Sequence, residues 1–229
     1  MKSLIIFRGD YSYVTTPEVV CKNLLKYIVS PMREKNHVID VIFCTYQSNL
    51  DKLKIYEEFL NPIGIHFTET GQINNFKASL QIVKDTYEKN IYDHILFLRF
   101  DVIYKINIDD WNIFNNDGIT FPFKEDTIEL FNSYKYYSDI IIILSNSIFL
   151  DVANFLINTN NQAYRPPNCL HNIFQIVQSN NNTIRVHTIL DGYYQSNTML
   201  TPNDPRLSPL HIQVKYEYRG KDKDLYFIN

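Results

Sequence analysis

Two charged residues interrupt the most apolar segment of the chain, and they are the first candidates for chemistry. Residues 94–98 read His-Ile-Leu-Phe-Leu, Arg99 and Asp101 follow with a phenylalanine between them, and apolar residues resume as far as Tyr104. A carboxylate at the end of a buried strand is costly unless a cation or hydrogen-bond donors meet it. Asp101 is therefore a candidate ligand for a divalent cation, and Arg99 a candidate for forked hydrogen bonds to phosphate oxygens.

The same two residues also allow a purely structural interpretation. Side chains alternate along a strand, so Arg99 and Asp101 point the same way and could simply pair with structural neighbours. Charges in a cleft favour a functional role without deciding it. The sequence leaves both interpretations open.

Two other apolar segments end in residues suited to a ligand. Residues 4–7, Leu-Ile-Ile-Phe, lead into Arg8 and Gly9. The glycine allows close approach of the backbone to a ligand, and the arginine suits a base or a pyrophosphate. Thr45 and Tyr46 end the second segment and could contact a nucleoside. For Arg8 and Gly9 the alternative is a plain turn with a solvated arginine.

Composition narrows the function classes. The chain has 229 residues, with 22 Lys and Arg against 25 Asp and Glu, a net charge of −3. This balance argues against a nucleic-acid partner. The three cysteines form no CxxC pair, which suggests buried thiols in a reducing compartment. The apolar run at the N-terminus is too short for a signal peptide, and no segment reaches the length of a membrane span, so we expect a cytoplasmic protein (host cytoplasm if viral). The abundance of Asn, Ile, Lys, Tyr and Phe indicates an AT-rich genome.

Strands and helices alternate in the first half of the sequence. This alternation predicts an α/β fold with a mostly parallel central sheet flanked by helices. Its strands are expected at 4–8, 38–46, 65–67 and 94–104, with helices from Pro17, from Ser48 or Asn49, and over 74–89. The second half is less regular, with strands expected at 118–123, 138–144, 183–187 and 212–218, and helices at 145–157 and after Pro167.

The predicted strand ends bring the candidate residues together. Because parallel strands end at one edge of a sheet, we expect Arg8 and Gly9, Thr45 and Tyr46, and Arg99 and Asp101 to share one rim. We identify no linker or internal repeat. The chain is therefore expected to be a single domain over 1–229.

These motifs resemble the metal-binding strand of GT-A-type glycosyltransferases. The resemblance comprises the Phe7-Arg8-Gly9 strand end, the Arg99-Phe100-Asp101 strand preceded by Tyr92-Asp93, and Ser138-Asp139 before an apolar strand. It extends in layout over most of 1–180, and is similar to glycosyltransferases of bacterial surface-polysaccharide clusters and of giant DNA viruses. It implies a GT-A-like (Rossmann-like) fold and transfer of a sugar from a nucleoside diphosphate sugar to a glycan hydroxyl, assisted by Mn²⁺ or Mg²⁺ at Asp101. The family's Asp-x-Asp has Arg99 in its first position here, so this arginine could partly replace the cation.

The resemblance also implies a nucleotide-binding half at 1–104 and an acceptor-side half at 105–229. Asp139 could deprotonate the attacking hydroxyl, although an Asp that bonds backbone amides is the alternative. His171, expected one turn into a helix, could serve as base or sugar ligand, or be a structural histidine. His187 and His211 could add metal ligands from the C-terminal region, but neither has a partner at metal-ligand spacing.

Other assignments remain open. Trp111 and the tyrosines at 134–137 could stack on a sugar or pack in the core. A non-catalytic nucleotide-sugar-binding or scaffold domain of the same fold is the second hypothesis. A nucleotidyltransferase is the third, although residues 9–13 lack the Gly-rich, Lys/Arg-bearing loop that such enzymes use.

Overall fold

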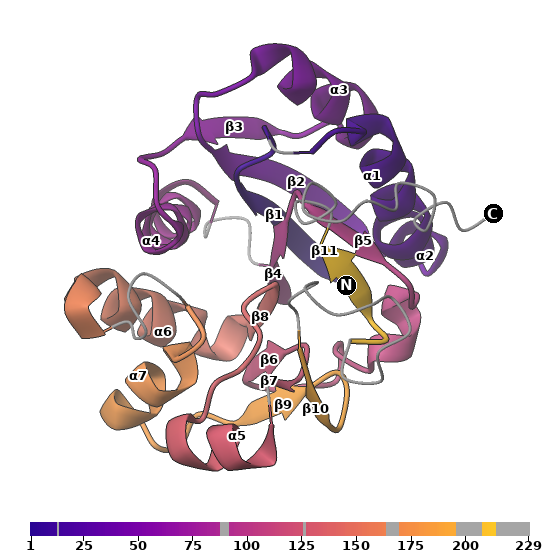
Figure 1. Ribbon diagram of the computed structural model, residues 1–229. Coiled ribbons are helices and arrows are strands. Elements are labelled where there is room, and N and C mark those ends of the chain that lie inside the picture. The colour runs from indigo at the N-terminus through magenta and orange to yellow at the C-terminus, as the bar shows by residue number, and fades with distance from the viewer. Residues whose placement is uncertain (13, 88–91, 126, 164–169, 196–207, 214–229) are drawn as a thin grey trace.

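A seven-stranded sheet runs through the centre of the structure (Figure 1). The computed structural model describes residues 1–229 apart from 13, 88–91, 126, 164–169, 196–207 and 214–229. The strands lie in the order β3-β2-β1-β4-β8-β6-β9. Their bounds are β1 Lys2–Gly9, β2 Val38–Thr45, β3 Gly64–Phe67, β4 His94–Arg99, β6 Ile119–Phe121, β8 Ile141–Ser145 and β9 Val186–Thr188.

Two small sheets and the helices complete the described fold. In the small sheets, β5 (Val102–Tyr104) pairs with β11 (His211–Gln213), and β7 (Lys124–Glu125) pairs with β10 (Tyr193–Tyr194). The α-helices are α1 Pro17–Leu24, α2 Ser30–Glu34, α3 Leu50–Leu60, α4 Gln72–Ile82, α5 Ile128–Tyr134, α6 Asn146–Asn158 and α7 Ile173–Asn180. Short π-helical segments at Leu25–Val29 and Val83–Tyr87 extend α1 and α4, and 3-10 turns lie at Ile108–Trp111 and Asn161–Ala163. None of the described helices is long and apolar enough to cross a membrane.

The central sheet is mixed, and one reversed strand shapes the site. β1 runs parallel to β2 and β4, whereas β8 runs antiparallel to both β4 and β6. Leu98, near the end of β4, therefore lies opposite Ile141, at the start of β8. The residues just before β8 consequently reach the same edge as the carboxyl ends of β1, β2 and β4.

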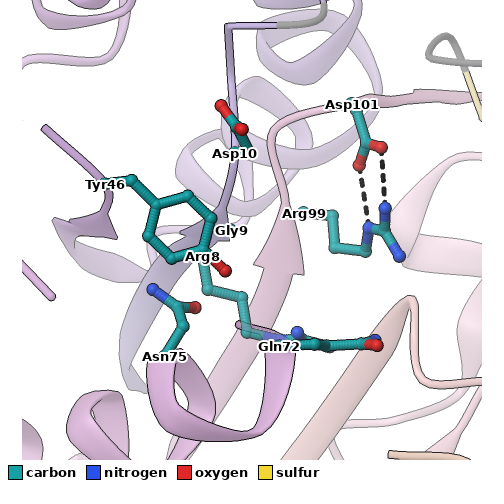
Figure 2. Close-up of a pocket in the computed structure, with 8 residues that line it drawn as sticks. All are labelled: Arg8, Gly9, Asp10, Tyr46, Gln72, Asn75, Arg99 and Asp101. Carbon is teal, nitrogen blue, oxygen red and sulfur yellow. Dashed lines mark hydrogen bonds and ion pairs between the residues drawn. The ribbon is translucent and has the colours of Figure 1, made fainter. Parts of the chain in front are cut away.

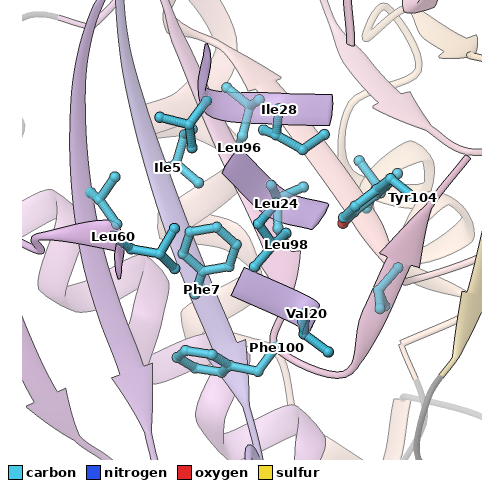
Figure 3. Close-up of a cluster of buried hydrophobic side chains, with 14 of the residues drawn as sticks. Ile5, Phe7, Val20, Leu24, Ile28, Leu60, Leu96, Leu98, Phe100 and Tyr104 are labelled. Carbon is cyan, nitrogen blue, oxygen red and sulfur yellow. The ribbon is translucent and has the colours of Figure 1, made fainter. Parts of the chain in front are cut away.

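Alternate residues of the central strands feed two separate cores. Ile5, Phe7 and Leu96 point towards α1 and α3, in the cluster drawn in Figure 3. Leu4, Ile6 and Phe97 point to the opposite face, which packs against α4, α6 and α7. Burial on both faces explains why these strands read as continuous apolar runs. Each core also contains one free cysteine, Cys21 in the first and Cys44 in the second.

The strand predicted at 94–104 is wrong in one respect. β4 ends at Arg99, and the chain turns at Phe100 and Asp101 before β5 joins a different sheet. Phe100 is fully buried and packs its ring against Phe7, Phe43 and two tyrosines. An apolar side chain thus anchors a turn, and for this reason the apolar pattern did not reveal the break.

Other predicted boundaries in the second half also shift. β8 begins at Ile141, so Asp139 precedes the strand. α7 begins at Ile173, so His171 lies before this helix and not one turn inside it. Helix α5 was not predicted, and α4 begins at Gln72, two residues before the predicted start. Of the strand predicted at 212–218, residues 212 and 213 belong to β11, and the remainder lies outside the described residues.

A buried histidine at the start of β4 makes the stability depend on pH. His94 is 7% exposed, and its Nδ1 atom has no hydrogen-bond partner within the described part of the chain. Burial lowers the pKa of this imidazole, and of nearby His37, below the ordinary value of about 6.5. The unfolded chain therefore takes up protons that the folded chain rejects. The stabilisation is present above about pH 6.5 and is lost as the pH falls below it.

We expect the free energy of unfolding to be lower at pH 5.5 than at pH 7.5, as measured by urea denaturation. The variant His94→Gln should show a smaller decrease, because it removes one of the three histidines whose pKa is lowered by burial, His37, His66 and His94. An unchanged pH dependence in this variant would contradict the assignment to His94.

Candidate functional site

A cavity of about 160 Å³ lies at the carboxyl ends of β1, β2 and β4 (Figure 2). Parallel pairing aligns these ends, since Gly9 lies opposite Thr45 and Arg8 lies opposite Arg99. The cavity is lined by Arg8, Gly9, Asp10, Tyr46, Gln72, Asn75, Arg99 and Asp101. The shared rim predicted from strand order therefore exists, and five of the six residues expected there line the cavity.

Arg8 is the most deeply buried charge of the cavity. Its side chain is drawn in Figure 2 extending towards Gln72, and the residue is only 2% exposed. One terminal nitrogen donates to the backbone oxygen of Asp139, and the guanidinium lies 5.4 Å from the centre of the Phe76 ring. Its Nε atom has no hydrogen-bond partner among the described residues.

The protonation of Arg8 reflects this setting. Burial lowers its pKa to about 10, and the nearby Asp139 carboxylate partly opposes that change. Arg8 consequently stays charged at neutral pH. A buried guanidinium with an unpaired donor is suited to binding an anion.

Arg99 and Asp101 form a two-pronged ion pair across the turn. The Nε atom of Arg99 donates to Oδ1 of Asp101 at 2.8 Å, and its NH2 nitrogen donates to Oδ2 at 2.7 Å (Figure 2). The two side chains are 15% and 5% exposed. The two residues therefore pair with each other, and this ion pair forms part of the wall of the cavity.

The remaining predicted nucleotide contacts separate into two kinds. Gly9 has φ of 94°, a left-handed conformation that favours glycine, and it turns the chain so that Asp10 lines the cavity. Tyr46 also lines the cavity. Thr45 is fully buried, and its hydroxyl donates to the Gly9 oxygen at 2.6 Å, so it supports the turn from behind.

Three residues of the cavity were missed by the sequence analysis. Asp10 follows the predicted glycine turn, and Gln72 and Asn75 come from the first turn of α4. The Nδ2 atom of Asn75 donates to the Cys44 oxygen at 2.9 Å, which leaves its buried Oδ1 atom without a partner among the described residues. Gln72 and Asn75 could have been identified because α4 follows directly after the edge strand β3, which places the first turn of the helix at the same edge of the sheet.

A second, more open hollow of about 630 Å³ adjoins the cavity. Asp10 and Tyr46 line both spaces, so the two lie side by side along this edge of the sheet. The hollow is lined further by Gln47, Ser48, Thr68, Glu69, Thr70 and Asn74. Its walls are thus polar, with hydroxyl, amide and carboxylate groups but no further cation.

The two predicted acceptor-side residues lie next to each other. The Oδ1 atom of Asp139 is 3.7 Å from Nε2 of His171, and Glu125 of β7 contacts the Nδ1 atom on the other side of the ring. Asp139 is 3% exposed, and its Oδ2 atom has no hydrogen-bond partner within the described residues. Arg8 links this group to the cavity through the Asp139 backbone oxygen. The sequence analysis did not single out Glu125.

The side chains do not fit a divalent cation at Asp101 as they stand. Both carboxylate oxygens of Asp101 already accept hydrogen bonds from Arg99. Within the described ranges, no group of three or more His, Cys, Asp or Glu could hold a metal ion. His187 contacts the Asp117 backbone oxygen at 3.3 Å, and His211 belongs to β11. A hard cation prefers several oxygen ligands, so one occupied carboxylate is a poor donor set.

The aromatic candidates for sugar stacking divide by exposure. Trp111 is 2% exposed and donates from Nε1 to the Ile106 oxygen at 3.3 Å, which makes it a core residue. Tyr137 is also buried and stacks on Phe121. Tyr134, which is 49% exposed, stacks on Tyr136 with ring centres 5.3 Å apart. Of the aromatic residues predicted as candidates, Tyr134 and Tyr136 are therefore the pair that could still stack on a sugar.

Comparison with known proteins identifies the fold. No family model and no curated protein sequence matches the chain. A 4-diphosphocytidyl-2C-methyl-D-erythritol synthase structure from Anaerococcus prevotii DSM 20548 has a TM-score of 0.56 at 11% identity, over 88% of this chain and 93% of that one. The catalytic domain of Drosophila beta1,4-galactosyltransferase 7 has a TM-score of 0.49 at 11% identity (100% and 76% covered). Mouse xyloside xylosyltransferase 1 has 0.48 at 12% identity (82% and 85% covered).

The first of these likenesses shows a shared fold. It confirms the predicted α/β class, a GT-A-like, mostly parallel sheet flanked by helices. Identity this low carries no information about activity. The division of the chain at residue 104 stays a prediction.

Proposed function

We propose that this protein is a glycosyltransferase that moves a sugar from a nucleoside diphosphate sugar to a glycan hydroxyl. The observation that supports it is the buried, charged Arg8 in a cavity at the carboxyl ends of three parallel strands. In open α/β sheets this edge is where ligands bind. The N-terminal turn of α4, which lines the same cavity, adds a favourable dipole for an anion.

The two adjoining spaces match the two parts of such a donor. The smaller cavity contains both guanidinium groups and is the place proposed for the diphosphate. The larger hollow has no cation and is the place proposed for the nucleoside, with Tyr46 between the two parts. Its hydroxyl and carboxylate groups suit the hydroxyls of a ribose and the edge of a base.

Arg8 and Arg99 are proposed to stabilise the leaving diphosphate. Charge accumulates on its oxygens as the bond to the sugar breaks, and fixed donors at that point lower the barrier. Arg99 would divide its hydrogen bonds between the phosphate and Asp101. This assignment takes over the role that the sequence analysis gave to Mn²⁺ or Mg²⁺, because the Asp101 carboxylate is already engaged by Arg99.

The binding of nucleoside diphosphates tests this assignment. We expect UDP, GDP or dTDP to bind equally well with EDTA and with Mn²⁺ by isothermal titration calorimetry. We expect Asp101→Asn to keep or improve that affinity, since it weakens the competitor for Arg99. Binding that requires Mn²⁺ and disappears in Asp101→Asn would restore the metal site predicted from the sequence. Thermal unfolding of the variant should accompany the titration, because Arg99 loses a buried partner.

A donor panel tests the function as a whole. A matching nucleotide sugar at about a hundred times its Kd should stabilise the fold by about 2.7 kcal/mol, or a shift of roughly 5–10 °C in Tm. The sugar should then appear on a glycan acceptor. If no nucleotide sugar raises the Tm, the proposed function is refuted. Binding without turnover would favour the non-catalytic alternative, and release of pyrophosphate from a nucleoside triphosphate would favour nucleotidyl transfer.

A further inference from the structure

We propose that Glu125 is a positioning residue that holds His171 so that its Nε2 atom takes the proton of the attacking hydroxyl. This inference rests on the proposed function, and it adds to that function a residue that the sequence did not reveal. The starting observation is that His171 lies between two buried carboxylates, Glu125 and Asp139, which come from different segments of the chain.

Backbone hydrogen bonds fix the spacing of this group. The Glu125 nitrogen donates to the Tyr136 oxygen at 3.0 Å, and the Tyr137 nitrogen donates to the His171 oxygen at 3.0 Å. The Ser138 nitrogen donates to the Phe123 oxygen at 3.1 Å. These bonds join β7, the segment before β8 and the residues before α7. The backbone therefore sets the spacing of the Glu125, Asp139 and His171 side chains.

The contact with Glu125 selects the tautomer of His171. A carboxylate accepts a hydrogen bond, so the Nδ1 atom of the ring carries the proton that faces Glu125. In the neutral ring the lone pair is then on Nε2. The Nε2 atom and the Asp139 Oδ1 atom are 3.7 Å apart, which is too far for a direct hydrogen bond between them, so the Nε2 lone pair can accept the proton of a hydroxyl.

Exposure decides which member of the group meets a substrate. The side chain of His171 is 28% exposed, whereas those of Glu125 and Asp139 are 10% and 4% exposed. His171 is therefore the member that an acceptor hydroxyl can reach. The stacked Tyr134 and Tyr136 rings lie beside it, with the Tyr136 ring centre 6.3 Å from the imidazole.

The proton and electron balance of the step is simple. The hydroxyl proton moves to Nε2, and the hydroxyl oxygen forms a bond to the anomeric carbon. The bond from that carbon to the diphosphate oxygen breaks, and the diphosphate takes the electron pair. The imidazolium that results lies between Glu125 and Asp139, which stabilise its charge. The Tyr136 ring also faces the imidazole. Arg8, which donates to the backbone oxygen of Asp139, is the nearby positive charge that disfavours the imidazolium.

An NMR titration of the full chain tests the positioning without any substrate. The His171 ring signals, assigned with His171→Gln, should titrate at a midpoint that falls by about one pH unit or more in Glu125→Gln. The ¹⁵N shifts of neutral His171 should show the Nδ1-protonated tautomer in the native chain and a mixture in the variant. Glu129→Gln, which removes an exposed carboxylate of α5, is the matched control and should leave both unchanged.

A midpoint and tautomer unchanged in folded Glu125→Gln would overturn the proposal. If that variant does not fold, Glu125→Asp replaces it, with a smaller decrease expected and the same overturning outcome. With a donor and acceptor in hand, kcat/KM should rise with pH through the His171 midpoint, and Glu125→Gln should move this rise to lower pH. A shifted titration in a chain that binds no nucleotide sugar would refute the transferase and keep the Glu125–His171 coupling.

Discussion

Replacing Arg8 by methionine should weaken the binding of a nucleoside diphosphate by about thirtyfold or more. Loss of one partner from a buried, charged contact costs about 2–5 kcal/mol, and 2 kcal/mol corresponds to a factor of about thirty. The effect is expected to be large because Arg8 lines the cavity, is buried and stays protonated, and because its Nε donor has no hydrogen-bond partner among the described residues. Calorimetric titration of the native chain and Arg8→Met measures it directly.

The matched control for this experiment is Arg33→Met. Arg33 lies exposed on α2, away from the cavity, and its replacement should leave the affinity within twofold. Arg8→Lys keeps the charge but not the forked geometry, and should retain an intermediate affinity. Unchanged binding in a folded Arg8→Met variant would exclude the cavity as the diphosphate site.

Replacing Phe100 by alanine should lower the free energy of unfolding by about 3–5 kcal/mol. The ring is fully buried, with its centre 5.0 Å from that of Tyr56 and 5.1 Å from that of Phe43. It anchors the turn that carries Arg99 and Asp101, so the variant should also lose affinity for nucleotides. Urea denaturation measures the first effect, and calorimetric titration well below the unfolding midpoint measures the second.

Two further variants serve as controls for the stability loss in Phe100→Ala. Phe67→Ala removes a ring that is 49% exposed on β3 and should change the free energy of unfolding by less than about 1 kcal/mol. Phe100→Leu fills part of the space and should cost less than Phe100→Ala. A Phe100→Ala variant as stable as Phe67→Ala would show that the aromatic cluster does not hold the turn.

The main strands could be predicted because the sheet is buried on both faces. A strand with helices on each side has no polar face, so β1, β2, β4 and β8 each read as a short apolar run. The same property hid the end of β4. Phe100 is as apolar as a strand residue, and its role as the anchor of a turn depends on Tyr56 and Phe43, which are far away in the sequence.

The candidate site was predictable where strand order alone determines position. Arg8, Gly9, Tyr46, Arg99 and Asp101 line one cavity because parallel strands end at the same edge. Which way a side chain turns was not predictable, so Thr45 was expected at the ligand and lies under the Gly9 turn instead. The engagement of Asp101 by Arg99 likewise depends on the turn and not on strand alternation.

The acceptor side shows a different limit. Asp139 and His171 are adjacent because β8 runs antiparallel to β4 and because the segment before α7 is hydrogen-bonded to Tyr137, two residues before Asp139. Glu125 belongs to a strand of only two residues, which has no periodic pattern. Its contact with His171 joins positions 46 residues apart in the sequence, so the sequence pattern offers no signal for it.

The separation of the two cores gives this chain a pair of natural reporters. Burial raises the pKa of both the Cys21 and the Cys44 thiol to about 12, so neither reacts readily while its own core is closed. Cys21 belongs to α1 on one face of the sheet, and Cys44 of β2 faces α4 on the other. Alkylation of each thiol therefore records the opening of one side of the molecule, and the two rates together distinguish loss of a single helical layer from complete unfolding.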